Sequence, residues 1–280
     1  METKPYHERI TDSKFRNAVD LLDAGDAVGL ERYLVQHPEL VYQRIWFNEE
    51  GYFKNPGLLE FVAENPVRHD RLPKNIVEVA RVILEAGAKN NAVQIAYTLG
   101  LVCSGHVARE YKVQIPLINL LCAYGADPNG GMLPALAHAE FEVVEVLIAR
   151  GVVVDLPTAS ATGRTDRAAK LIRLSDNRQK HLALAFAAQH GHPEILKLLL
   201  DAGQNPNLYN PEGAHMFSTP LHQAILSGHE KNVRMLVEAG ARMDLKDTIY
   251  HGNALDWAMH VENIAIADYL RSQGAEPGGQ

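Results

Sequence analysis

The 280-residue sequence has only two cysteines, Cys103 and Cys122, too few for a disulfide framework in a chain of this length. Both follow apolar residues and lack the spacing of a zinc site, so we expect small buried thiols in a reducing compartment. The N-terminus lacks the apolar core of a secretion signal, and no run approaches the ~18 apolar residues of a membrane span. These absences favour a cytoplasmic protein.

A surplus of basic charge is also missing. The chain has 27 basic and 34 acidic residues and a net charge of −7, divided as −4 over residues 1–140 and −3 over the rest. Neither half has the positive surface that binds phosphate backbones or anionic lipid. We therefore expect no nucleic-acid partner and no membrane partner.

Two segments near the C-terminus share a pattern. Thr219-Pro220-Leu221-His222 opens an apolar helical pattern that leads to Gly228-His229, and residues 182–203 repeat that spacing around Gly191-His192. A threonine and a proline suit a helix start, because the hydroxyl caps free N–H groups and proline loses no hydrogen bond there. Glycine supplies the left-handed backbone conformation of a tight turn between helices.

This pattern resembles the ankyrin repeat, whose period is about 33 residues, and in particular uncharacterised bacterial ankyrin-repeat proteins. The resemblance implies an all-α solenoid of about eight helix-turn-helix units, with some extended or missing finger loops. One unit cannot bury its own apolar face, so we expect a single domain over residues 1–280. The units start near residues 16, 57, 96, 130, 154, 182, 219 and 253.

Departures from the period fall in loops. Residues 41–55 contain five aromatic residues and are expected to form a hairpin finger with Gly51 near its turn, where Trp46, Phe47, Tyr52 and Phe53 are candidate partner-binding residues. The alternative is that Trp46, Phe47 and Phe53 pack onto the solenoid as local core. Polar insertions at residues 65–75 and 105–112 are expected to be solvated ridges.

A second group of candidates lies in two later loops. Residues 207–218 contain Tyr209, His215, Met216 and Phe217, and residues 244–252 contain Tyr250 and His251. These side chains suit a contact surface, although Met216 and Phe217 could equally pack as repeat core. Units four and five are short, so fingers there are expected to be missing and to leave a central recess.

Catalytic motifs are absent from the sequence. His69-Asp70 lies in a loop without further metal ligands, and His190-Gly191-His192 is explained by the turn between two helices. There is no phosphate-binding loop, nucleophile elbow or metalloprotease motif. We therefore expect no enzyme activity, no catalytic residues, no metal and no cofactor.

The resemblance implies a protein–protein interaction scaffold that binds a partner of unknown identity through its finger loops and concave helix face. The alternatives are a small-molecule binder or hydrolase using the central recess, or a self-associating structural protein. We expect a monomer. The fold alone does not decide among these functions.

Overall fold

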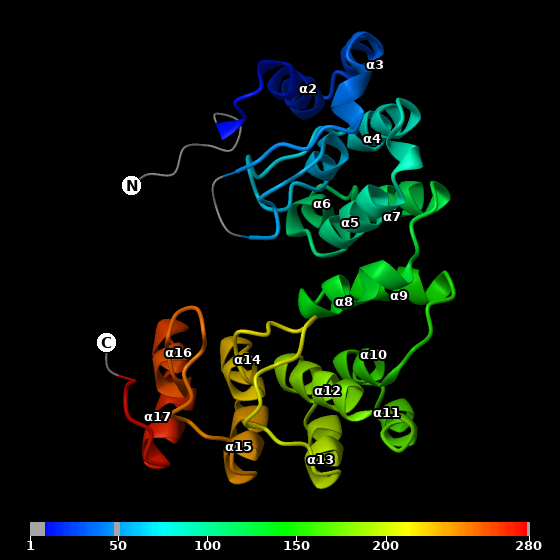
Figure 1. Ribbon diagram of the computed structural model, residues 1–280. Helices are drawn as coiled ribbons and strands as arrows, with labels where there is room; N and C mark the ends of the chain where they lie inside the picture. The colour runs from blue at the N-terminus through cyan, green and yellow to red at the C-terminus, as the bar shows by residue number, and fades with distance from the viewer. Residues whose placement is uncertain (1–8, 48–50, 279–280) are drawn as a thin grey trace. The chain divides into compact units, whose positions relative to one another are not determined.

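The structure is a computed structural model that describes residues 9–47 and 51–278, and helices account for more than half of the chain (Figure 1). The chain forms two compact units, Met1–Val152 and Val153–Gln280. Within each unit, helices pair as antiparallel hairpins and the pairs stack on one another. The predicted all-α architecture is confirmed, whereas one continuous domain over residues 1–280 stays a prediction.

In the first unit, the described residues form four helix pairs. The first members are α2 (Ser13–Ala24), the 3-10 helix η2 (Leu58–Ala63), α5 (Ala92–Cys103) and α8 (Asn129–Ala137). Their partners are α3 (Ala27–Gln36), α4 (Ile76–Glu85), α7 (Gln114–Ala123) and α9 (Phe141–Ala149). Three short helices complete the unit: η1 (Pro38–Val41), η3 (Ala88–Asn90) and α6 (His106–Glu110).

The second unit also has four pairs among its described residues. The first helices α10 (Leu156–Ala161), α12 (Asn177–Gln189), α14 (Pro220–Leu226) and α16 (Ala254–His260) stack in one layer. The second helices α11 (Thr165–Leu171), α13 (Pro193–Asp201), α15 (Glu230–Glu238) and α17 (Ile264–Ser272) stack in another. All eight first helices of the two units begin within five residues of the predicted starts.

The core of the second unit lies between these two layers. Leu184 and Leu221 on first helices and Leu196, Leu199 and Leu236 on second helices are 0–1% exposed and belong to one apolar cluster. Leu196 and Leu199 are three residues apart and so lie on one face of α13. Burial of that face against the neighbouring pair is what holds the stack together.

The turns follow the predicted chemistry. At the start of α14, His222 Nδ1 accepts a hydrogen bond from the Thr219 backbone N–H at 3.2 Å and lies 2.8 Å from the Thr219 hydroxyl. His192 Nε2 lies 3.0 Å from the carbonyl of Ala161, one pair earlier. Gly191 has φ +73°, and a Cβ there would lie 2.6 Å from the ring of His229. The structural role predicted for His192 is confirmed, and His222 and His229 also contact the backbone of the turns.

The insertion at residues 65–75 is not a solvated ridge. The Arg68 side chain is 1% exposed and forms ion pairs with Asp23 at 2.7 Å and Glu64 at 2.9 Å, while its guanidinium lies 4.9 Å from the centre of the Phe61 ring. His69 Nε2 lies 3.1 Å from Asp23. A buried charge must be paired, so these contacts tie the loop to α2.

Two smaller expectations also need correction. Residues 106–110 of the third insertion form α6, whose Val107 and Ala108 are fully buried, so this segment too is packed. Cys103 is buried as predicted and burial raises the pKa of its thiol, but Cys122 is only half-buried. Cys122 lies on α7, whose apolar residues are not confined to one face.

Candidate partner-binding site

The first aromatic loop is a hairpin that buries half of its predicted candidates. Its two arms are joined by hydrogen bonds from Ile45 N–H to the Pro56 carbonyl and from Phe47 N–H to the Lys54 carbonyl, and an isolated antiparallel bridge between Arg44 and Gly57 lies at its base. The hairpin prediction is thus confirmed for the described residues. Residues 48–50, next to the expected turn at Gly51, lie outside them.

Within this hairpin the rings separate into two groups. Phe47 and Phe53 are 4% and 6% exposed and join a ring cluster in which Phe53 contacts Phe61 at a centroid distance of 5.3 Å. Neither presents its ring to a partner, because both fill the space between the hairpin and η2. Trp46 and Tyr52 are 70% and 60% exposed. The packing alternative is therefore right for the two phenylalanines and wrong for Trp46.

In the second unit, the two predicted fingers are bonded to each other. The finger at 207–218 will be called the lower finger and the finger at 244–252 the upper finger. The Tyr209 hydroxyl donates to the Lys246 carbonyl at 2.6 Å, and the Thr248 N–H donates to the Phe217 carbonyl at 2.9 Å. These bonds join two consecutive repeats, so the fingers form one surface rather than two separate loops.

Asp247 organises the upper finger. Its carboxylate is buried and accepts hydrogen bonds from the backbone N–H groups of Ile249, Tyr250 and Gly252 and from Trp257 Nε1. Burial raises the pKa of Asp247, but the four hydrogen bonds outweigh it and hold the pKa below its ordinary value. The ionised side chain therefore fixes the loop that carries Tyr250.

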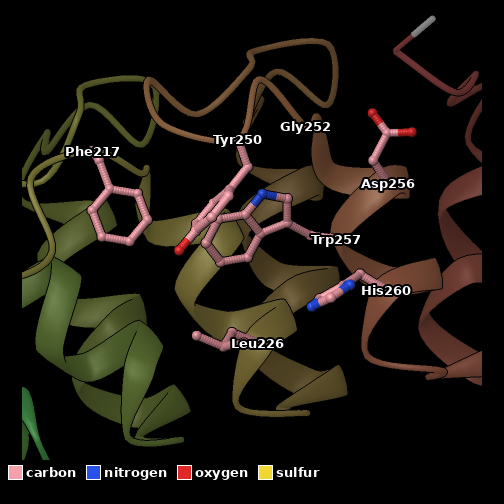
Figure 2. A pocket seen from close by; sticks show the side chains of 7 residues that line it. All are labelled: Phe217, Leu226, Tyr250, Gly252, Asp256, Trp257 and His260. Atoms are coloured by element: carbon pink, nitrogen blue, oxygen red, sulfur yellow. The ribbon is translucent and has the colours of Figure 1, made fainter. Parts of the chain in front are cut away.

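Below the upper finger lies an apolar pocket of about 470 Å³, shown in Figure 2. Tyr250 and Gly252 come from the upper finger, Phe217 from the end of the lower finger, and Leu226 from the last turn of α14. Helix α16 contributes the remaining lining residues, Asp256, Trp257 and His260. The pocket is thus assembled from two repeats and the loops that precede their first helices.

The side chains that line this pocket differ in how far they are buried. Phe217 lies 6.2 Å from both Tyr250 and Trp257, measured between ring centroids, and is half-buried. Trp257 is only 8% exposed, whereas Tyr250 and Leu226 are 74% and 48% exposed. The Asp256 carboxylate accepts hydrogen bonds from the N–H groups of Asn253 and Gly278, so it serves the helix start and the C-terminal segment.

The remaining predicted residues of the two fingers do not line this pocket. Tyr209, His215 and Met216 belong to the lower finger, and Met216 is 63% exposed, so it does not pack as repeat core. Phe217 is packed against the core cluster and also lines the pocket, so its packing is confirmed and its role in partner binding stays a prediction. His251 is exposed beside Tyr250.

Of the lining residues, sequence reasoning predicted only Phe217 and Tyr250 and missed Leu226, Gly252, Asp256, Trp257 and His260. Leu226 and His260 occupy equivalent places in consecutive repeats, each two residues before the left-handed residue that ends the helix, Gly228 or Glu262. The same register is buried in the two preceding repeats, at Ala161 and Gln189, so it does not by itself mark a position that lines a pocket.

The described residues bear on two further kinds of site, a metal centre and a membrane-spanning helix. Within residues 9–47 and 51–278, no group of three histidine, cysteine or acidic side chains comes together as metal ligands. In the same ranges, none of the helices has the length and apolarity needed to cross a bilayer.

Paired helices in stacked layers, with finger loops preceding the first helices, define a repeat solenoid. In agreement, the family "Ankyrin repeats (3 copies)" matches residues 105–247 and 184–280, so the chain belongs to the ankyrin-repeat family.

Several curated proteins are similar to parts of the chain. Ankyrin repeat and SAM domain-containing protein 6 of Mus musculus is 34% identical over 103 residues, 36% of this chain and 11% of that protein. Probable E3 ubiquitin-protein ligase XBOS32 of Oryza sativa subsp. japonica is 34% identical over 108 residues, 37% of this chain and 21% of that protein. Putative palmitoyltransferase ZDHHC13 of Danio rerio is 26% identical over 224 residues, 78% of this chain and 29% of that protein.

The chain spans less than a third of the length of these relatives. Their names describe whole proteins, so the ligase and palmitoyltransferase activities are not carried to this chain. All three come from eukaryotes, and they do not show the expected resemblance to bacterial proteins.

Proposed function

We propose that this protein is a non-enzymatic interaction scaffold whose second unit binds a protein partner at the pocket between the fingers and the first helices of the last two repeats. Ankyrin repeats are generally protein–protein interaction modules. The observation that carries the proposal is the pocket itself, which is lined by exposed Tyr250 and Leu226 together with the nearly buried ring of Trp257. Aromatic anchors in a pre-formed apolar pocket are the usual centre of a binding interface.

The pocket is also suited to binding at low entropic cost. Asp247 fixes the upper finger through four hydrogen bonds, and the Tyr209 and Thr248 bonds hold the two fingers together. A partner side chain that enters the pocket therefore meets a surface that needs little ordering. We propose that the partner supplies an apolar side chain, because five of the seven lining residues are apolar, aromatic or glycine.

Quantitative capture of partners from the source cells tests this function. Leu226→Ala and Tyr250→Ala together should strongly reduce capture, because they remove two exposed walls of the pocket, while leaving the melting temperature nearly unchanged. Ile264→Ala is the matched control, since Ile264 is an apolar residue of the same unit, 74% exposed and outside the pocket. A captured protein should then bind the purified chain with the same ranking of variants.

Other outcomes assign the chain to a different class. Equal capture by the double variant and the control places the binding surface elsewhere. Concentration-dependent assembly of the purified chain, abolished by Leu226→Ala and Tyr250→Ala, makes the pocket a self-association surface. We propose a cytoplasmic monomer that binds neither nucleic acid nor membrane, so sedimentation should give a single species at all concentrations tested.

A further inference from the structure

One segment of this negatively charged chain has a net positive charge. Residues 164–180 contain six basic and two acidic residues, a net charge of +4, so the rest of the chain carries −11. The segment includes α11, the second helix of the first pair in the second unit, and the turn that follows it. Arg167, Lys170 and Arg173 recur every third residue and are all exposed. Arg167 and Lys170, three residues apart on α11, lie side by side, and Arg173 follows in the turn beyond the helix, so the three charges are close in sequence and not separated by an acidic residue.

Most other exposed cations of the second unit are neutralised by a neighbouring carboxylate. Lys197 pairs with Asp201 at 2.7 Å, Arg234 with Glu230 at 2.6 Å and Arg242 with Asp244 at 2.8 Å. Lys231 and Arg271 have acidic partners as well, at 3.2 and 3.0 Å. The exposed charges of this unit are thus arranged mainly as short-range pairs.

Lys170 and Arg173 differ from these cations. Among the described residues, neither forms an ion pair, although Asp166 stands four residues before Lys170, the spacing at which helical pairs form. Arg167 donates to the Val154 carbonyl at 3.3 Å, and that neutral acceptor does not offset its charge. One ordinary reason for a basic residue here is the C-terminus of α11, whose carbonyls favour a cation such as Lys170. That reason does not cover Arg173, which lies beyond the helix end.

The unpaired cations line a concavity. Asp166, Ala169, Lys170 and Arg173 line a hollow of about 520 Å³, and Leu174, the residue after Arg173, is 81% exposed. Lys170 and Arg173 both line the hollow, so a carboxylate side chain that enters it meets two cations that lack an ion-pair partner among the described residues. The exposed leucine adds an apolar contact at the margin.

We propose that α11 and the following turn form a second docking surface, which binds an acidic peptide segment of a protein partner through Lys170 and Arg173. Arginine and lysine clusters recognise acidic motifs through charge-assisted hydrogen bonds. The surface lies in the layer of second helices and is separate from the pocket beneath the upper finger. An extended polyanion is a poorer fit, because a duplex or an anionic bilayer would also meet the −11 carried by the rest of the chain.

Fluorescence anisotropy with a labelled oligoglutamate peptide of about eight residues tests the proposal directly. The full chain should bind the peptide, and affinity should fall as salt is raised from about 0.05 to 0.3 M. Lys170→Ala combined with Arg173→Ala should weaken binding by roughly tenfold or more, since two charge-assisted contacts are lost. Asp166→Ala should strengthen binding, because it removes the one carboxylate at the hollow.

The matched control is Lys197→Ala combined with Arg234→Ala, which removes the same charge from paired cations of the same unit. It should change affinity less than about twofold. Absence of peptide binding, or an equal loss in both double variants, overturns the proposal. Binding of a DNA duplex or of phosphatidylserine vesicles that the peptide cannot displace also overturns it. Leu226→Ala with Tyr250→Ala should leave peptide binding intact, so failure of this surface and failure of the pocket are distinguishable.

Discussion

Trp257 donates its indole N–H to Asp247 at 2.9 Å, and this bond joins the first helix of the last repeat to the finger above it. The contact does two things at once. It satisfies the one polar group of a nearly buried ring, and it supplies the side-chain donor to a carboxylate that also holds three backbone N–H groups of the finger. The shape of the pocket therefore depends on a bond that lies behind its surface.

Replacing Trp257 by phenylalanine tests whether the upper finger depends on the hydrogen bond between Trp257 and Asp247. The substitution removes the N–H and leaves a buried carboxylate with one donor fewer, at a cost of about 1–3 kcal/mol in the free energy of unfolding. Urea denaturation measures the loss, and partner capture should weaken because the upper finger is less firmly held. Tyr250→Phe is the control, since its side chain is 74% exposed, and it should leave the unfolding free energy unchanged. Equal stability of the two variants would contradict the role given to this bond.

Glu60 should make the stability of the chain depend on pH. Its side chain is 1% exposed beside Arg44, and burial raises its pKa from 4.5 to about 7 against the opposing charge of Arg44. The folded state then binds a proton that the unfolded state has lost, so this contribution is complete below pH 4.5 and disappears as the pH rises through about 7.

Glu60→Gln cannot ionise and should abolish that pH dependence. Relative to the wild type, its free energy of unfolding should rise by on the order of 3 kcal/mol between acid and neutral pH. Denaturation curves across this range test the sign. Arg44→Ala should extend the loss to higher pH, because it removes the charge that lowers the pKa. Parallel curves for wild type and Glu60→Gln would show that Glu60 is ionised equally in both states.

Replacing Arg68 should lower the free energy of unfolding more than the replacement of a polar side chain usually does. Arg68→Ala leaves Glu64 and Asp23 without their shared cation in a buried site, which costs roughly 3–5 kcal/mol. Thermal and urea unfolding measure the change. Arg71→Ala is the control, because Arg71 is an exposed arginine of the same loop, and it should be nearly neutral. Similar effects of the two substitutions would mean that the loop is held by other contacts.

Leu199→Ala and Leu236→Ala should each lower the free energy of unfolding by roughly 2–5 kcal/mol, because both fully buried side chains pack between adjacent repeats. Leu208→Ala, in the lower finger, should cost much less because Leu208 is 51% exposed. Chemical denaturation of all three variants checks the ranking. A small effect at Leu199 would argue against inter-repeat packing as the source of stability.

Much of the fold was predictable because its signals are local. Thr219 and Pro220 start α14, and Gly191 and Gly228 turn the chain between paired helices, in each case through the backbone preferences of a few adjacent residues. The stripe at Leu196 and Leu199 is likewise visible as a helical period. The sequence by itself therefore determined the repeat class, the starts of the eight repeats and the structural histidines.

The tertiary structure decided which exceptional residues are buried and which are exposed. From the sequence, Arg68 is interpreted as a solvated charge. In the fold it is buried against Asp23, which lies 45 residues away along the chain. Phe47 and Trp46 are adjacent and equally apolar, but the pairing of Phe47 with Lys54 turns one ring inward and leaves the other outside. The pocket needs Phe217, Leu226, Tyr250 and Trp257 from two repeats. Such contacts join residues distant along the chain, and only the packing of neighbouring repeats brings them together.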